Sequence, residues 1–352
     1  MGRPGNKKKA GRGTIKQVHN RFDKYTYSDD EEAPQDVESS TQTEFLKIYP
    51  KTILNKIDSP DIDFSWGMNP YQGCEHGCIY CYARTTHEYW GYNAGLDFEK
   101  KIMVKTEAPD ILQRQLRSKS WKGQTIMLSG NTDCYQPIER KMKITRKMLE
   151  ICEMHQQSVG IITKNALISR DLDILEKMAK KNLVRVAISI TSRDEQLRRI
   201  LEPRTSSFKA KMNTVTKLSA AGIPVNVMMA PIIPGLNDHE IMKMARDSKK
   251  AGAHNLNYTM IRLGGPIKGL FENWLKEYFP DRYNKVMKKI IEAHEGSTTS
   301  SRFGERMIGK GHTADIIRQQ IHLAKARFKL DQEMPPLNTS LFRQRPDQLK
   351  LF

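Results

Sequence analysis

The middle of the chain alternates short apolar runs with longer stretches in which apolar residues recur at helical spacing. The short runs predict buried strands at residues 125–131, 159–164, 183–191, 223–230 and 255–262. The amphipathic stretches predict helices at residues 139–157, 172–179, 194–221, 238–250, 267–278, 281–294 and 313–328. Strand–helix units that recur about every 30 residues are typical of parallel strands joined by right-handed crossovers.

A further strand is expected to lead into Cys74, which gives about six strand–helix units, fewer than the eight of a closed barrel. The predicted fold class is therefore α/β, as either an open parallel sheet or a partial barrel. In both, a functional site lies at the carboxyl ends of the strands. Small polar residues gather at four of these ends, namely Ser129 to Asp133, Thr163 to Asn165, Ser189 to Thr191 and Pro231 to Gly235.

Three of the five cysteines, Cys74, Cys78 and Cys81, fall within eight residues at a C-x3-C-x2-C spacing. Three thiolates on one inorganic centre leave a fourth position open for chemistry. Structural zinc with His76 as the fourth ligand is one alternative. However, His76 stands between the first two cysteines, where it is too constrained to complete a tetrahedron, and no second C-x2-C pair follows. The other alternative is a [4Fe–4S] cluster with one free iron.

The stretch from Asn69 to Arg84 resembles the radical S-adenosylmethionine superfamily. The resemblance rests on the cysteine motif and on the strand–helix units after it, and it covers about residues 65–265. Within the superfamily the chain is similar to the branch related to spore photoproduct lyase. The motifs Gly130 to Pro137, Glu202-Pro-Arg204 and Ala230 to Gly235 support that placement.

The resemblance implies a partial (βα)6 TIM-like barrel over residues 46–265, with a helical C-terminal extension over residues 266–352. It also implies a [4Fe–4S] cluster on Cys74, Cys78 and Cys81, with S-adenosylmethionine on the open iron. Reductive cleavage of this cofactor would give a 5′-deoxyadenosyl radical that abstracts hydrogen from a substrate. A reductant such as flavodoxin or ferredoxin is then an expected partner.

Further residues match the family's cofactor contacts by resemblance. Tyr80 matches the aromatic residue whose backbone meets the adenine. Thr132 and Asp133, with the adjoining Asn131, match the place where the methionine amino group binds, and an anionic Asp133 suits an ammonium partner. A helix N-cap is the alternative role for Asp133.

Lys164 and Ser189 stand at the ends of the next two predicted strands. By resemblance, Lys164 matches a lysine that holds the methionine carboxylate, and Ser189 matches a hydroxyl on the ribose side. The alternative for Lys164 is a solvated strand end, and for Ser189 it is a small filler residue. Their position beside the cysteine loop favours the cofactor roles.

The hydrogen donor of the family is missing from its expected place. Spore photoproduct lyase uses a cysteine three residues before the equivalent of Asp133, and that position here is Gly130. Cys134 follows Asp133 on the predicted rim; packing is its favoured role, and substitution for the missing donor is the alternative. Cys152 is predicted to be core. Two kinds of reaction therefore remain. One is repair or modification of a nucleic acid, for which the family's lyase chemistry is the model, and the other is action on a small molecule or protein. A basic nucleic-acid-binding protein with a structural metal is the non-enzymatic alternative.

The net charge of +18 is distributed unevenly. Residues 1–24 contribute +7 from eight bases and one acid, and residues 25–50 contribute −6 from one base and seven acids. Residues 51–352 contribute +17 from 49 bases and 32 acids, so the folded body is itself basic. This charge favours an anionic partner, with DNA or RNA as the first candidate. Residues 1–45 have few apolar side chains and are predicted to be disordered.

Two further features limit the function. No run of about 18 apolar residues and no apolar signal-peptide core is present, which together with clustered free cysteines predicts a cytoplasmic protein. The segment from Gly304 to Gly311 resembles a phosphate-binding loop, but Gly311 replaces the Ser or Thr that binds Mg²⁺. Nucleotide hydrolysis is therefore not predicted, and the segment is either a helix-entry turn or a loop against substrate phosphate.

Overall fold

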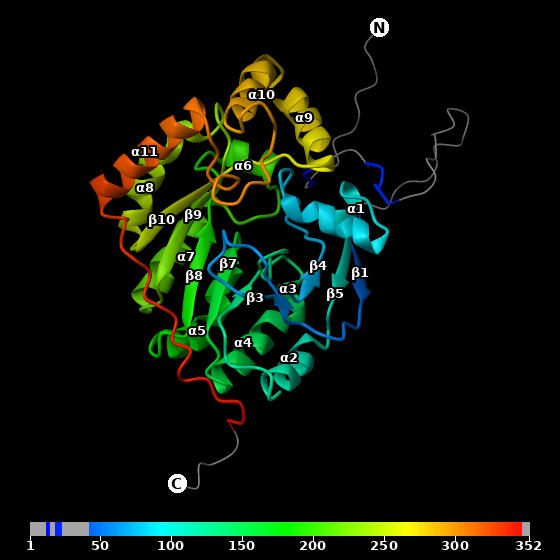
Figure 1. Ribbon diagram of the computed structural model, residues 1–352, viewed down its shortest axis with the longest axis vertical. Helices are drawn as coiled ribbons and strands as arrows, with labels where there is room; N and C mark the ends of the chain where they lie inside the picture. Colours follow the sequence, from blue (N-terminus) through cyan, green and yellow to red (C-terminus); the bar gives the residue numbers. More distant parts are fainter. Residues whose placement is uncertain (1–11, 15–17, 23–41, 347–352) are drawn as a thin grey trace, which may run out of the picture.

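The structure, a computed structural model, describes residues 12–14, 18–22 and 42–346. Its main sheet has the strand order β10-β9-β8-β7-β6-β3-β2, in which only the edge strand β2 is antiparallel (Figure 1). The strands are β2 (Asn55–Lys56), β3 (Trp66–Met68), β6 (Ile126–Leu128), β7 (Val159–Thr163), β8 (Val184–Ser189), β9 (Val225–Ile232) and β10 (Asn255–Met260). The predicted α/β fold with six parallel strands is confirmed, and the barrel is partial because β10 and β2 are separate edges.

From residue 139 onward the helices lie where the periodicity predicts them, whereas α1 and α2 were not predicted. They are α1 (Leu96–Lys100), α2 (Ala108–Leu116), α3 (Glu139–Met142), α4 (Ile144–Met154), α5 (Leu172–Ala179), α6 (Glu195–Leu201), α7 (Phe208–Ala220), α8 (Ile241–Lys250), α9 (Pro266–Tyr278), α10 (Tyr283–Glu292) and α11 (His312–Phe328). Short 3-10 segments are η1 (Tyr82–Trp90), η2 (Ala166–Asp171), η3 (Asp238–Glu240) and η4 (Pro280–Arg282). The predicted helix 139–157 is interrupted at Lys143, whose φ of 54° is left-handed.

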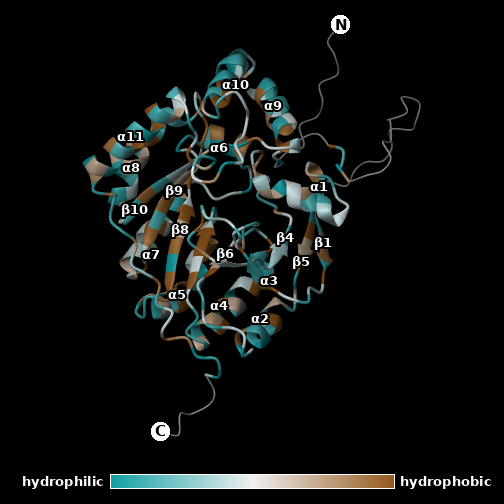
Figure 2. Ribbon diagram, viewed as in Figure 1, coloured by the Kyte–Doolittle hydropathy of each residue, from teal (hydrophilic) through white to brown (hydrophobic). Residues whose placement is uncertain are grey.

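The strands are apolar because both faces of the parallel sheet are covered. In β8, Val184, Val186 and Ile188 are buried, and Ala187 and Arg185 are partly buried on the alternate positions. Figure 2 shows the sheet as mainly hydrophobic, whereas the helices carry hydrophilic residues on part of their surface. This pattern is what a parallel sheet under a layer of amphipathic helices requires.

A second, three-stranded sheet was not predicted. It has the order β1-β5-β4 and consists of β1 (Glu44–Lys47), β5 (Lys101–Val104) and β4 (Tyr71–Gln72). Strand β4 has only two residues, and its partner β5 lies about 30 residues later, so the local pattern gave little signal for it. The cysteine loop begins directly after β4, and this sheet therefore fixes where the loop starts.

The loop between β2 and β3 spans the open side of the barrel. In this loop Asp61 accepts a hydrogen bond from the Gly304 amide at 2.6 Å and forms an ion pair with Arg306. Met307, next in the chain, is joined to the opposite edge because its carbonyl accepts from the Met260 amide of β10 at 2.8 Å. Residues 304–307 therefore connect the two edges of the sheet at the mouth of the barrel.

The C-terminal extension packs on the core along its length. The helix α11 lies beside α8 (Figure 1), and the Leu256 amide of β10 donates to the Leu330 carbonyl at 3.2 Å. Farther along, the Asn338 amide donates to the Asn182 carbonyl at 2.8 Å. The three helices predicted for this extension are present as α9, α10 and α11. None of the helices in the described part of the chain is long and apolar enough to cross a membrane.

The predicted disordered tail, residues 1–45, lies mostly outside the described residues. Its described parts pack on the folded body: Arg12, Thr14 and Asn20 are buried, and β1 begins at Glu44. The sequence predicted that ordered structure begins near Phe45, whereas short segments before that residue also contribute to the fold.

A substitution at Gly160 of β7 can test how the loop between β2 and β3 packs against the sheet. A Cβ on Gly160 of β7 would lie 2.2 Å from the ring of Phe64, which is buried and covered by Arg185 at 5.0 Å. We expect Gly160→Ala to lower the free energy of unfolding by about 1–3 kcal/mol through overpacking. The matched control is Gly269→Ala in α9, where the added methyl meets nothing within 4 Å and helix propensity predicts a gain of up to about 1 kcal/mol. Urea unfolding of both variants measures the difference, and equal effects would contradict this account.

Candidate cofactor site at the cysteine loop

The cysteine loop, residues 74–81, runs from β4 to η1 and is tied to two distant elements. The Cys74 amide donates to the Phe98 carbonyl at 2.9 Å, and the Ile79 amide donates to the Leu201 carbonyl at 3.0 Å. Cys74 and Cys78 are buried and Cys81 is half-buried. The loop turns at Gly77, whose φ of 66° is the left-handed conformation that glycine adopts without strain. The backbone that carries the three thiols is therefore fixed.

The Arg84 side chain stabilises this turn by donating hydrogen bonds to its backbone carbonyls. This side chain is fully buried, and its Nε donates to the Cys78 carbonyl at 2.9 Å. One Nη donates to the Gly77 carbonyl at 3.2 Å and to the Glu99 carboxylate at 2.6 Å. Since a guanidinium cannot lose its charge in a protein, the buried carboxylate of Glu99 is its necessary partner.

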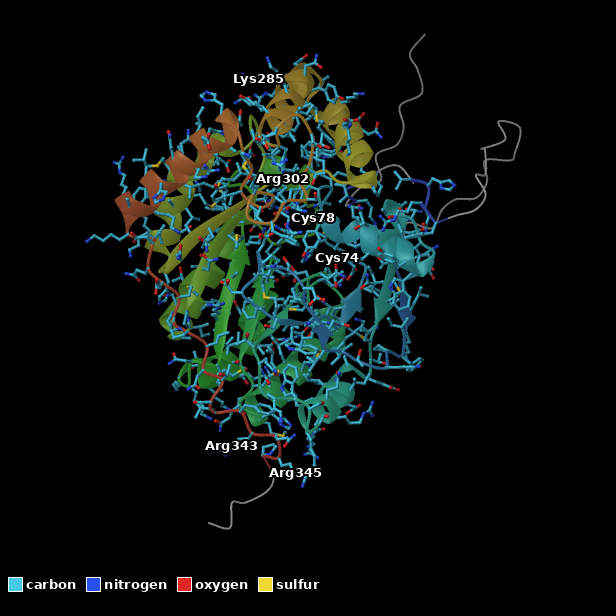
Figure 3. The ribbon with its side chains drawn as sticks, in the orientation of Figure 1. Cys74, Cys78, Lys285, Arg302, Arg343 and Arg345 are labelled. Atoms are coloured by element: carbon cyan, nitrogen blue, oxygen red, sulfur yellow. The ribbon has the colours of Figure 1, made fainter. Side chains whose placement is uncertain are left out.

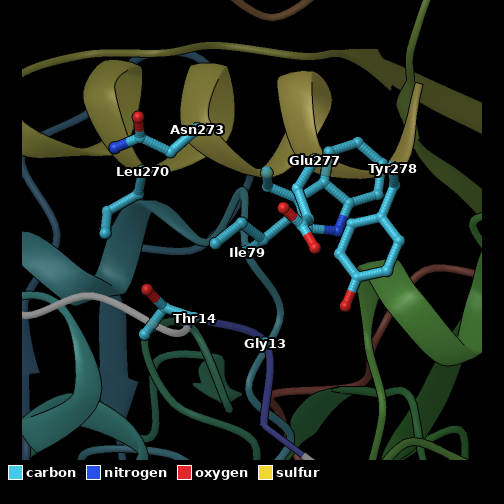
Figure 4. Close-up of a pocket in the computed structure, with 8 residues that line it drawn as sticks. Gly13, Thr14, Ile79, Leu270, Asn273, Glu277 and Tyr278 are labelled. Carbon is cyan, nitrogen blue, oxygen red and sulfur yellow. The ribbon is translucent and has the colours of Figure 1, made fainter. Parts of the chain in front are cut away.

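A segment from the N-terminal part of the chain completes this arrangement. The amides of Gly13 and Thr14 donate to the two Glu99 carboxylate oxygens at 2.9 and 3.0 Å, and Arg12 donates to the Glu99 carbonyl at 2.7 Å. A Cβ on Gly13 would lie 1.7 Å from the Gly77 carbonyl oxygen, so only glycine fits there. Figure 4 shows Gly13 and Thr14 opposite Ile79 and below α9. Residues 12–14, which we call the strap, therefore press directly on the cysteine loop.

The three thiols lie in an environment that disfavours free thiolates. Burial raises the pKa of Cys74, Cys78 and Cys81. The nearby Asp133 and the other two thiols raise the pKa of Cys74 further. Binding to iron replaces these protons by a cation, so the donor set fits a thiolate-held cluster. Among the described residues, no three Cys, His, Asp or Glu side chains are placed to hold a single metal ion. In a [4Fe–4S] cluster with one open iron, the three thiolates would instead bind three separate irons.

His76 connects the loop to the main sheet. Its Nδ1 lies 3.3 Å from the Asp133 carboxylate, and its Nε2 lies 3.2 Å from the Asn165 side-chain nitrogen. Both ring nitrogens thus face other side chains, which gives the zinc alternative no support from this residue. Sequence reasoning expected His76 to lie near the cluster, and the structure assigns it these two contacts.

Asp133, at the end of β6, is surrounded by donors. One carboxylate oxygen accepts from the Tyr135 amide at 2.8 Å and the Thr163 hydroxyl at 2.8 Å. The other accepts from the Lys164 amide at 2.8 Å and faces His76. Burial raises the pKa of Asp133, but His76 and these hydrogen bonds outweigh it and lower the pKa overall. The four acceptor positions of the carboxylate are occupied, so Asp133 joins β6, β7 and the cysteine loop.

Lys164 and Ser189 meet at the mouth of the barrel, as predicted for neighbouring strand ends. The Lys164 Nζ donates to the Ser189 hydroxyl at 2.7 Å and to the Ala230 carbonyl at 3.1 Å. It lies 3.5 Å from Glu202 and 5.6 Å from the centre of the Tyr80 ring. Burial lowers the pKa of Lys164, but Glu202 outweighs it and the pKa is raised, so the ammonium stays charged.

Glu202 is the functional residue that sequence reasoning missed. It is fully buried, pairs with Lys211 at 2.8 Å and accepts hydrogen bonds from Tyr80 and Thr191. Burial raises the pKa of Glu202, but Lys211 and Lys164 lower it well below the usual range. The motif Glu202-Pro-Arg204 was used only to support the resemblance, and its acidic residue was the available signal.

Three further predicted residues lie between β4 and β6. The Thr132 hydroxyl donates to the Tyr71 carbonyl at 2.6 Å, and the Asn131 side chain donates to Gln72 at 3.4 Å. Cys134 is wholly buried in the main apolar core, and burial raises the pKa of its thiol. This burial favours the packing role expected for Cys134 over its alternative role as a hydrogen donor. The Tyr80 hydroxyl, which had no predicted role, points to Glu202.

A loop with three thiols at the carboxyl ends of a parallel α/β sheet defines the class of cofactor-dependent partial-barrel proteins. The chain belongs to the radical SAM superfamily, whose family model matches residues 68–248. It is 32% identical over 251 residues to an uncharacterized protein of Mycobacterium tuberculosis strain H37Rv, covering 70% of this chain and 74% of that protein. An uncharacterized protein of Methanocaldococcus jannaschii is 26% identical, covering 71% and 89%.

Solved structures show the same fold at low sequence identity. A spore photoproduct lyase mutant with bound AdoMet and dinucleoside spore photoproduct superimposes with a TM-score of 0.57 at 17% identity. The match covers 81% of this chain and 79% of that chain. A second spore photoproduct lyase mutant gives a TM-score of 0.58 at 18% identity with the same coverage. Membership of the superfamily implies a 4Fe–4S cluster and S-adenosylmethionine as cofactors.

Unfolding measurements can test whether the ion pair between Arg84 and Glu99 stabilises the cysteine loop. Glu99→Ala leaves the buried Arg84 guanidinium and two strap amides without their carboxylate, and we expect it to lower the free energy of unfolding by about 3–5 kcal/mol. The control is Glu176→Ala, which removes an exposed ion pair with Lys180 and should change stability by less than about 1 kcal/mol. Urea unfolding of both variants checks this. Equal small losses would show that the loop does not depend on Glu99.

Proposed function

We propose that the protein is a radical S-adenosylmethionine enzyme in which Cys74, Cys78 and Cys81 hold a [4Fe–4S] cluster. The observation that carries the proposal is a hydrogen-bonded loop with three cysteines, two buried and one half-buried, beside the charged Lys164. When bound, the cluster and S-adenosylmethionine supply one-electron cleavage of the cofactor and hydrogen abstraction from a substrate. A flavodoxin or ferredoxin is the proposed class of reductant.

The chain's own residues have the task of holding the cofactor and excluding water. Lys164 is the proposed cation for the methionine carboxylate, since it is charged and only partly enclosed, with 17% of its side chain exposed. Ser189 shares its hydroxyl with this ammonium and is the proposed ribose-side contact. Backbone near Tyr80 is proposed to meet the adenine, and the Tyr80 hydroxyl is held by Glu202.

Asp133 and its neighbours are proposed to form the methionine amino side. Because protein donors already occupy the Asp133 carboxylate, the amino group would have to displace one of them, and His76 at 3.3 Å is the longest contact. Asn131 has only weak side-chain contacts, at 3.4 Å, and is free to turn toward the cofactor. Thr132 is engaged with a backbone carbonyl and supports the strand end.

A nucleic-acid lesion is the proposed substrate class. Two observations support it: the basic folded body, and the fold shared with a lyase whose structure contains a dinucleoside photoproduct. Figure 3 shows basic side chains at both ends of the molecule, with Lys285 on α10 and Arg343 and Arg345 near the C-terminus. The burial of Cys134 supports a packing role for that residue rather than hydrogen donation.

Cluster assembly tests the first part of this proposal. After anaerobic reconstitution with iron and sulfide, we expect the native chain to bind about four irons and to form 5′-deoxyadenosine with S-adenosylmethionine and dithionite. Cys81→Ala should lose both properties, whereas the core variant Cys152→Ala should keep them. A Cys81→Ala protein that still held four irons and cleaved the cofactor would contradict the assignment of the cluster to these three cysteines. Zinc alone in anaerobically purified protein would favour the structural-metal alternative.

Lys164→Met tests the cofactor contact. Loss of a charge-assisted hydrogen bond predicts a rise of about 10–100-fold in the Kd for S-adenosylmethionine, measured by equilibrium dialysis on the reconstituted protein. The matched control is Lys211→Met, because Lys211 also neutralises Glu202 but lies behind it and is buried. If both variants weakened binding equally, Lys164 would act only by neutralising Glu202 and not by binding the cofactor.

A further inference from the structure

Arg262, two residues beyond the end of β10, carries a charge that the described residues leave without a carboxylate in ion-pairing range. One Nη donates to the Met307 sulfur at 3.4 Å, which is a weak acceptor. The Nε is buried and has no hydrogen-bond acceptor among the described residues. A guanidinium in this state is unusual, because a buried charge is normally paired.

The nearest acid does not satisfy Arg262. Asp61 contributes to the electrostatic environment of Arg262, but its oxygens are engaged by the Gly304 amide and by Arg306. Burial and the neighbouring Arg306 lower the pKa of Arg262. The two arginines therefore form a local excess of positive charge at the mouth of the barrel.

Two exposed aromatic rings flank this charge. Tyr82, directly after Cys81, is 60% exposed, its hydroxyl donates to the Gly130 carbonyl, and it is near enough to Arg262 to affect its pKa. Phe303 is 54% exposed and lies 4.3 Å below the Arg306 guanidinium. Exposed aromatic rings around a cation suit stacking of nucleobases beside a bound phosphate.

The lysine of the glycine-rich segment, residues 304–311, is not available to bind a phosphate. Lys310, which stands where a phosphate-loop lysine would, is engaged by Glu295 at 3.2 Å and Glu305 at 3.5 Å. Gly311 precedes α11, so the segment enters a helix, as one of the two alternatives predicted. Among the described residues, Arg262 is a cation next to this segment that has no ion-pair partner.

We propose that Arg262 binds a phosphate group of a nucleotide-containing substrate, with Tyr82 and Phe303 flanking the attached bases. The proposal rests on the proposed function, since it places the phosphate at the mouth that opens beside the cysteine loop. A planar guanidinium with free donors matches phosphate oxygens in a bidentate manner. The phosphate belongs either to a nucleic-acid backbone or to a mononucleotide.

Equilibrium binding tests this proposal on the full chain. Fluorescence anisotropy with a fluorescein-labelled single-stranded oligothymidylate, at salt from about 50 to 200 mM, gives the affinity and its salt dependence. Arg262→Gln is expected to weaken binding about tenfold or more and to reduce the salt slope by about one. Arg262→Lys keeps the positive charge but loses the two parallel donors of the guanidinium, so its affinity should lie between those of the native chain and Arg262→Gln. Arg246→Gln, on α8 and paired with Asp247, is the control and should bind like the native chain.

A competition arm identifies the source of the phosphate. Thymidine 5′-monophosphate displacing the probe, with thymidine inactive, would assign the site to a mononucleotide phosphate. Displacement only by unlabelled oligonucleotide would assign it to a nucleic-acid backbone. Equal affinity of the native chain and Arg262→Gln, or no binding by the native chain at about 50 mM salt, would overturn the proposal. These measurements use neither S-adenosylmethionine nor reductant, so their failure is distinct from failure of the cofactor chemistry.

Discussion

Three neighbouring thiols that are largely withdrawn from water are the constraint on which the site depends. Each has its pKa raised by burial, and the charges of neighbouring groups raise that of Cys74 further. Thiolates can persist there only with a compensating cation, which a metal cluster provides. The backbone that carries them is held by protein contacts alone, through Arg84, Glu99 and the strap. The chain thus supplies a rigid frame into which a cluster fits.

Buried carboxylates organise the rest of this region. Glu99 joins the strap to Arg84, Asp133 joins the strand ends to His76, and Glu202 joins Lys164 to Lys211. Each carboxylate links segments that are far apart in the chain. Since an acid deprived of its partners inside a protein is costly, each also fixes the position of the cation that it binds. The orientation of Lys164 at the mouth is a consequence of this arrangement.

The local pattern predicted the elements that have a regular period. Five of the six parallel strands and the helices from α4 to α11 follow from apolar spacing, and the cysteine motif placed the loop and the strand before it. The buried polar partners did not follow, because Glu99 and Gly13 are 86 residues apart and a buried acid looks like a surface acid in sequence. The role of Cys134 also needed the structure, because a cysteine beside a strand end reads the same in sequence whether it packs in the core or faces the site.

The central claim is that the cysteine loop holds a cluster with one iron free for S-adenosylmethionine. The most direct measurement is electron–nuclear double resonance of the reduced, reconstituted protein with the cofactor labelled by ¹⁵N in its amino group and ¹⁷O in its carboxylate. The account predicts hyperfine coupling of both labels to the cluster, since both groups bind the open iron. A reduced [4Fe–4S] signal with cofactor bound but with neither label coupled would contradict it.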